Sequence, residues 1–263
     1  MTLHATTLHQ RATGEAAVSL GPAGLLDLRQ QGSAKAILPH VAGLPEVVFL
    51  NTSGGLTGGD RLQYRTDLAD GVRAVATTQT AERAYLATEG VARVEVAHQV
   101  GADGWLDWLP QETILFNGCA LHRTTRVELG RGAGCLLLEA VVLGRAAMGE
   151  VVTSVAFTDR REVWQGGRLR LLEPLQLTDA VLGTGAAGLN GARAFASIAM
   201  IGPGVEDALG PVRAVLGQDA AASAFDGKLM VRIMAADGWP LRVQIARVLR
   251  VLTGRALPRV WQM

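Results

Sequence analysis

The sequence predicts a mainly β protein with helices confined to its last third. Over roughly the first two thirds of the chain, apolar and polar residues alternate with a period of two. Turn signals recur about every 8–12 residues, and glycine supplies 32 of the 263 residues. The apolar fraction of 49% is enough for a sizeable core. No linker divides the chain, so we expect a single domain over residues 1–263.

The strands are expected in the following order. Alternation over residues 62–68 predicts a half-buried strand, and Asp70-Gly71 predicts a hairpin turn into a return strand over 72–78. Further strands are expected over residues 91–100, 105–116 and 135–144, as a pair joined by Gly-Gly over 161–177, and over 228–235. No repeat of fixed period indicates a regular solenoid.

Two helices are expected after the period changes. Residues 204–217 predict a short helix interrupted at Gly210-Pro211. A second helix is predicted from Pro240 to a stop at Gly254. Its apolar face would hold Leu241, Ile245, Val248, Leu249 and Leu252.

Composition excludes several classes of protein. The formal charge is +1, without the basic stripe of a nucleic-acid binder. There is no signal-peptide pattern at the start and no run of about 18 apolar residues that would cross a membrane. Cys119 and Cys135 match neither a disulfide framework nor a CxxC metal pair. We therefore expect a cytoplasmic protein that binds neither nucleic acid nor membrane.

The stretch LNTSGGLTGGDRL (50–62) carries two glycine pairs, Gly54-Gly55 and Gly58-Gly59, directly before Asp60. It lacks the lysine of a phosphate loop, and a strand follows where a dinucleotide site needs a helix. Two interpretations remain. Asp60 accepts backbone N–H groups in a compact corner, or the glycines leave room beside its carboxylate for water, an ion or another backbone.

Glu139 lies within CLLLEAVVLGR, a pattern typical of a strand buried on both faces. An ionised carboxylate without partners there would cost several kcal/mol or become protonated. It is therefore either paired with Arg145 or another arginine, or part of the polar lining of an internal wet channel. Glu150 is a second candidate, or an exposed turn acid. Glu112 lies near a proline in an otherwise apolar stretch.

No catalytic machinery is visible in the sequence. The five histidines show no metal-binding spacing, and no GxSxG elbow is present. His98 shares a strand face with valines, so we expect a hydrogen-bonded core histidine. Trp105 and Trp108 are expected to be core or interface aromatics rather than cofactor stackers.

Five blocks in order carry a family resemblance. They are SGGLTGGDRL (53–62), TTQTAERAY (77–85), WLPQETILFNGC (108–119), LEAVVLGRAAMGE (138–150) and LPRVW (257–261), the last ending in Trp261. With these blocks the chain resembles the UreD (UreH) family of urease accessory proteins. The first 30 or so residues and the 183–225 region match loosely.

The resemblance implies a non-enzymatic maturation factor made of stacked β-layers of β-helical character, with two short helices in the C-terminal third. It implies binding to apo-urease and to UreF, which recruits the GTPase UreG. The C-terminal helix and tail would face UreF, unless the helix simply packs on the sheet. The resemblance also implies no tightly bound cofactor, with Ni²⁺ only in transit through an internal water-filled tunnel.

Conduction favours weak oxygen ligands, because an ion must leave each site as readily as it enters. Asp60, Glu139 and Glu150 fall within the matching blocks and are the candidate path residues, with Glu173 added from a looser match. Two alternatives remain open. One is a hydrolase that uses Asp60 and Glu139 about 5–10 Å apart, and the other is an interaction protein without an ion path.

Overall fold

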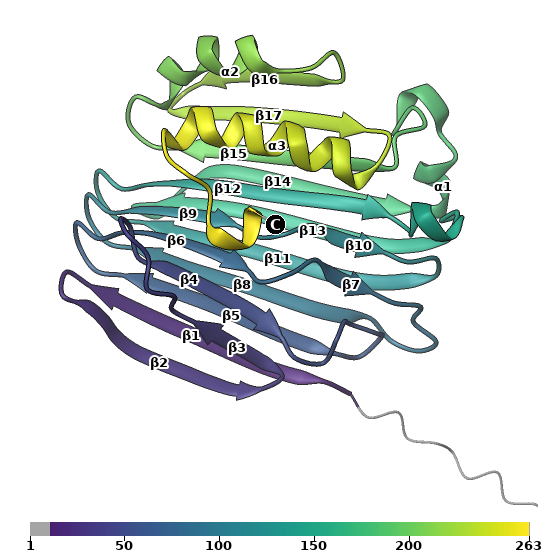
Figure 1. Ribbon diagram of the computed structural model, residues 1–263, viewed down its shortest axis with the longest axis horizontal. Coiled ribbons are helices and arrows are strands. Elements are labelled where there is room, and N and C mark those ends of the chain that lie inside the picture. The colour runs from purple at the N-terminus through teal and green to yellow at the C-terminus, as the bar shows by residue number, and fades with distance from the viewer. Residues whose placement is uncertain (1–10, 263) are drawn as a thin grey trace, which may run out of the picture.

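The computed structural model describes residues 11–262, which form two stacked β-sheets with the longest helix on one outer face (Figure 1). The mainly β class is confirmed. One sheet has seven strands: β1 (Thr13–Gly21), β2 (Gly24–Gly32), β5 (Arg61–Leu68), β8 (Ala92–Val100), β11 (Cys119–Leu129), β13 (Val155–Gln165) and β14 (Arg168–Thr178). Their spatial order is β14-β13-β11-β8-β5-β1-β2.

The other sheet has ten strands. They are β3 (Ala34–Ile37), β4 (Glu46–Asn51), β6 (Arg73–Thr78), β7 (Glu82–Ala84), β9 (Trp105–Leu109), β10 (Thr113–Leu115), β12 (Gly134–Leu143), β15 (Ala194–Ile201), β16 (Ala220–Phe225) and β17 (Lys228–Ala235). The main path is β16-β17-β15-β12-β9-β6-β4-β3, and β10 joins β12 to β7.

From β4 to β13 the chain passes repeatedly between the sheets and forms a β-solenoid of about four turns. In the seven-stranded sheet the neighbouring strands from β1 through β5, β8 and β11 to β13 are parallel, whereas the outer pairs β1-β2 and β13-β14 are antiparallel. Leu62, Val94, Arg123 and Asp159 are lateral neighbours at intervals of 32, 29 and 36 residues. Because the intervals differ, the coils leave no fixed period in the sequence. The expected β-helical character is confirmed.

The Asp70-Gly71 turn is not a hairpin, contrary to the prediction. β5 belongs to the seven-stranded sheet and β6 to the ten-stranded sheet, so the turn carries the chain around a corner. Gly71 has a φ of 70° and donates its N–H to the Ala102 carbonyl of the next corner, at 2.8 Å. A hairpin and a solenoid corner both need a positive φ, so the dipeptide does not distinguish them.

The two predicted helices are present. α3 (Gly238–Thr253) packs on the outer face of the ten-stranded sheet. Leu241, Ile245, Val248 and Leu249 are buried as predicted, and Leu252 is half-buried. α2 (Leu209–Val215) follows a 3-10 turn, η3 (Val205–Ala208). Gly210-Pro211 does not interrupt α2, because proline is tolerated in a first helical turn.

Short helical turns complete the fold. They are α1 (Asp179–Leu182), which the sequence did not predict, and the 3-10 turns η1 (Ala146–Met148), η2 (Gly185–Ala187) and η4 (Arg259–Trp261). All ten residues of β12 are buried, because one face lies inside the solenoid and the other lies under α3. Among residues 11–262, no helix has the length and apolar character needed to cross a bilayer.

Candidate functional site

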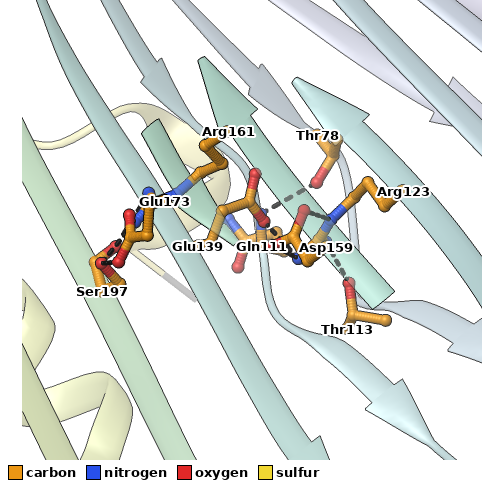
Figure 2. A network of polar contacts seen from close by, with 9 residues as sticks. All are labelled: Thr78, Gln111, Thr113, Arg123, Glu139, Asp159, Arg161, Glu173 and Ser197. Atoms are coloured by element: carbon orange, nitrogen blue, oxygen red, sulfur yellow. Dashed lines mark hydrogen bonds and ion pairs between the residues drawn. The ribbon is translucent and has the colours of Figure 1, made fainter. Parts of the chain in front are cut away.

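A strip of charged side chains crosses the otherwise apolar space between the sheets (Figure 2). Side chains alternate along a strand, so Leu137, Glu139 and Val141 of β12 all point into the solenoid. Opposite them, β11 contributes Arg123 and β13 contributes Asp159 as its direct lateral neighbour. Two residues beyond Asp159 on the same strand, Arg161 is paired in register with Glu173 of β14.

Arg123 is the centre of the strip. Its Nη2 lies 2.8 Å from Glu139 Oε2 and 2.8 Å from Asp159 Oδ2, and its Nη1 donates to Thr113 Oγ1 at 2.9 Å. Burial lowers the pKa of Arg123, but the charges of Asp159 and Glu139 outweigh that effect and hold it above its ordinary value. One arginine therefore serves two buried acids.

A second group surrounds Glu173. Its carboxylate forms ion pairs with Arg161 and Arg232 and accepts a hydrogen bond from Ser197 Oγ at 2.8 Å. Ser197 on β15 lies beside Glu139 in register, and Arg232 on β17 lies beside Ser197. In Figure 2 the Arg161 group and the Arg123 group lie on either side of Glu139. The strip is thus continuous across both sheets.

The pKa of Glu139 is raised above its ordinary value. Burial raises its pKa to about 7, with Arg123 opposing the shift and Asp159 adding to it. The strip contains three arginines, Arg123, Arg161 and Arg232, and three acids, Glu139, Asp159 and Glu173. A cation that binds Glu139 must therefore compete with a proton and with the neighbouring arginine.

Glu139 lines two cavities. The corner cavity, about 80 Å³, runs from Gly54 and Gly55 at the surface inward to Arg123 and Glu139. The edge cavity, about 310 Å³, runs from Glu139 outward; Asp159, Glu173, Ser197 and Arg232 line it. A bound water needs roughly 10–15 Å³ by this measure, so each cavity has room for several. Glu139 is the residue common to both walls.

The profile of the UreD urease accessory protein family matches residues 11–262. This chain belongs to the UreD family. Urease accessory protein UreD of Cereibacter sphaeroides (strain ATCC 17025 / ATH 2.4.3) is 65% identical over 263 residues, covering 96% of each chain. The Paracoccus denitrificans (strain Pd 1222) protein of that name is 56% identical, covering 96% of this chain and 93% of its own length. That of Rhizobium leguminosarum bv. viciae is 43% identical over 271 residues, covering 100% of this chain and 99% of its own length.

In this UreD-family chain, Asp60 lies outside the strip and outside both cavity walls. Its carboxylate accepts the Ala12 N–H at 2.7 Å and the Thr57 N–H at 2.8 Å, as the compact-corner interpretation predicts. Among residues 11–262, no hydrogen bond or ion pair joins Asp60 to Glu139. The glycines of the same corner do reach the cavity, because Gly54 and Gly55 form part of its mouth.

Glu150 is a surface acid, and Arg145 is its partner. Arg145 Nε donates to Glu150 at 2.8 Å, and the Asn117 N–H donates at 3.0 Å. Slight burial works against ionisation, but these hydrogen bonds hold the pKa of Glu150 below its ordinary value. Of the two expected ion-pair partners of Glu139, Arg145 or another arginine, the second is confirmed: the partner is Arg123, which comes from the opposite sheet.

Glu112 and Trp261 take part in packing at the C-terminal tail. Arg242 of α3 lies 3.4 Å from Glu112 and stacks over the Trp261 ring at 4.6 Å. The indole N–H of Trp261 donates to the Leu109 carbonyl at 3.0 Å. The tail is thus held against β9, and the apolar face of α3 covers the sheet rather than facing outward.

Four residues of the two cavities are not predicted from the sequence: Arg123, Asp159, Arg161 and the mouth residue Glu82. A signal for the first three was present, because each occupies an inward position in an alternating strand. His98 is buried as expected but has no hydrogen-bond partner for either ring nitrogen among residues 11–262. Within the same residues, no group of three or more His, Cys, Asp or Glu side chains is arranged to hold a metal ion.

Proposed function

We propose that this chain is a non-enzymatic factor in urease maturation that passes hydrated Ni²⁺ between its two sheets toward apo-urease. Membership of the UreD family supports the maturation role, since the relatives are named urease accessory proteins. The observation that supports the ion path is the position of Glu139, which lines both the corner cavity and the edge cavity.

The chemistry of the strip suits a passing ion better than a resident one. Its acids offer carboxylate oxygens, which bind a hydrated divalent cation without the tight hold of a thiolate or imidazole cage. Neighbouring arginines repel the cation and compete for the same oxygens, which shortens its residence. Because Arg123 is shared by two acids, it can stay with Asp159 while Glu139 contacts the ion.

A second candidate function is a purely structural interaction protein. It is favoured by the ion pairs that Glu139, Asp159 and Glu173 all make with arginines. No comparable observation favours a hydrolase that uses Asp60 and Glu139. Both carboxylate oxygens of Asp60 accept backbone N–H groups, so they are engaged in holding the corner.

The partners proposed for the chain are UreF, through it the GTPase UreG, and apo-urease, all in the cytoplasm. No resident cofactor is proposed; nickel is the cargo. The test is co-expression of apo-urease and the other accessory proteins with and without this chain. We expect nickel per urease active site and urease activity to fall strongly without it. Fully nickel-loaded urease in its absence would contradict the proposal.

A Glu173→Gln variant separates the path from the structural alternative. If the variant still assembles with its partners, the path predicts that the rate of nickel loading falls at least about fivefold, equal to about 1 kcal/mol of barrier. The structural alternative predicts an unchanged rate whenever the complex forms. Glu128→Gln, on the outer face of β11, is the matched control, since Glu128 also pairs with an arginine but lines neither cavity.

A further inference from the structure

Four acids line the two cavities, and Glu82 differs from the rest. The other three, Glu139, Asp159 and Glu173, form ion pairs with arginines. Glu82 has no ion-pair partner among residues 11–262. A desolvated carboxylate without a counterion is a place where an added cation lowers the free energy.

The hydrogen bonds to Glu82 are few and long. Asn51 Nδ2 lies 3.4 Å from Oε1 and 3.3 Å from Oε2, and the Arg83 N–H lies 3.1 Å from Oε1. These contacts orient the carboxylate at the start of β7 without saturating its lone pairs, of which an ionised carboxylate has about four. Because Glu82 lies in the wall of the corner cavity, its remaining lone pairs are available to water or an ion.

The wall of the corner cavity around Glu82 is rich in oxygen, and the two arginines of that wall, Arg83 and Arg123, form no ion pair with Glu82 among residues 11–262. Burial raises the pKa of Glu82 to about 7; hydrogen bonds from Asn51 and Arg83 and the charge of Arg83 oppose the shift, and Asp60 adds to it. Tyr64 also lines the corner cavity, and burial and the charge of Glu82 hold the pKa of its phenol above its ordinary value. Thr78 and Thr80 add further oxygens to the cavity wall.

We infer that Glu82, held by Asn51 at the mouth of the corner cavity, is the site where a hydrated divalent cation first binds this protein or last leaves it. The inference rests on the proposed function and adds a specific entry or exit residue to it. An all-oxygen site of this kind suits a hydrated Ni²⁺ or Mg²⁺ ion rather than a soft metal. The ion must also displace the proton that Glu82 carries below neutral pH.

The test is equilibrium dialysis of the assembled complex against Ni²⁺ alone. Wild type is compared with Glu82→Gln and with Glu95→Gln, an exposed acid on the outer face of β8. Because the variants share the same partners, nickel held by the partners cancels in the comparison. We expect Glu82→Gln to lose one weak site, or at least about tenfold in its affinity, equal to about 1.4 kcal/mol. The affinity of the wild-type complex for Ni²⁺ should fall as the pH is lowered from 7.5 to 6, because protons compete for Glu82.

Asn51→Asp provides a second variant that adds charge to the same place. Asp keeps the oxygen that accepts from Ser53 Oγ at 2.6 Å, so the corner is preserved. We expect nickel to bind more tightly to it than to wild type. Unchanged nickel binding in both Glu82→Gln and Asn51→Asp would overturn the inference.

Nickel loading of urease distinguishes the two proposals. If Glu139→Gln abolishes loading while Glu82→Gln binds and delivers nickel normally, the mouth site is refuted and the path stands. If Glu82→Gln loses its nickel site while both variants yield fully loaded urease, the site exists and the path is refuted.

Discussion

At the scale of single residues, the buried charges of the strip stabilise one another only as a set. Arg123 is 6% exposed, and it is the arginine shared by Glu139 and Asp159. Removing one member of a buried ion-pair network leaves the others desolvated and unpaired, which costs more than the network itself contributes.

We therefore predict that Arg123→Met destabilises the fold by about 3–5 kcal/mol at pH 8. The reason is that Glu139 and Asp159 would then face each other without a counterion. The measurement is urea unfolding followed by circular dichroism. A triple variant, Arg123→Met with Glu139→Gln and Asp159→Asn, should recover most of the loss. A single-variant effect below about 1 kcal/mol would show that water or rearrangement already compensates.

His98 should make the fold sensitive to acid. Burial lowers its pKa to about 3 from an ordinary value near 6.5. Between those values the unfolded chain binds a proton that the folded chain does not, so stability falls with falling pH by about 1.4 kcal/mol per unit. Glu139 acts in the opposite direction, since its pKa is raised to about 7 and the folded state binds the extra proton.

We predict that His98→Leu stabilises the protein at pH 7 by about 1–3 kcal/mol, because an unpartnered buried polar group is removed. The advantage over wild type should grow by about 2 kcal/mol at pH 5. Comparing the two proteins cancels the opposite contribution of Glu139. An advantage that is equal at pH 7 and pH 5 would mean that His98 is protonated in the folded state.

At the scale of elements, the corner formed by Gly54, Gly55, Gly58 and Gly59 contains glycines that no larger residue can replace without cost, and Gly54 and Gly55 also lie at the mouth of the corner cavity. A Cβ at Gly58 would lie 2.0 Å from the Glu89 carbonyl oxygen, a backbone atom that cannot easily move. A Cβ at Gly54 would meet open space, although its φ of 82° strains any other residue. The two glycines are therefore required for different reasons.

We predict that Gly58→Ala lowers the free energy of unfolding by about 1–3 kcal/mol through overpacking. Gly54→Ala should cost about 1 kcal/mol through backbone strain. Thermal unfolding of the two single variants gives the comparison. A larger loss for Gly54→Ala would show that backbone conformation, rather than the close approach at Glu89, determines this corner.

Local elements could be predicted from the sequence, but their partners could not. Alternation located β5 and β8, and uninterrupted apolar character correctly indicated that β12 is buried on both faces. The Asp70-Gly71 turn carried no information on whether the next strand returns to the same sheet. The burial of Glu139 predicts either a partner, Arg145 or another arginine, or a place in the lining of a wet channel, and nothing in the sequence says which arginine would supply the pair. The actual mate lies across the solenoid, and the irregular coil length hides that register.

At the scale of the whole molecule, the solenoid sets two inner faces opposite each other, and both cavities between them have walls of mixed polar and apolar side chains. The corner cavity and the edge cavity involve β4, β7, β12, β13, β14 and β17, which lie far apart along the chain (Figure 1). Their common wall is a single carboxylate from the strand at the centre of the ten-stranded sheet, Glu139. The proposed path therefore depends on this side chain more than on any other.

The most direct test of the path is the rate at which apo-urease acquires nickel when the assembled accessory complex contains Glu139→Gln. Gln keeps the size of the side chain and removes its charge. We predict a fall of at least about tenfold in the rate, about 1.4 kcal/mol of barrier, with complex assembly intact and Glu95→Gln indistinguishable from wild type. An assembled Glu139→Gln complex that loads urease at the wild-type rate would contradict the path.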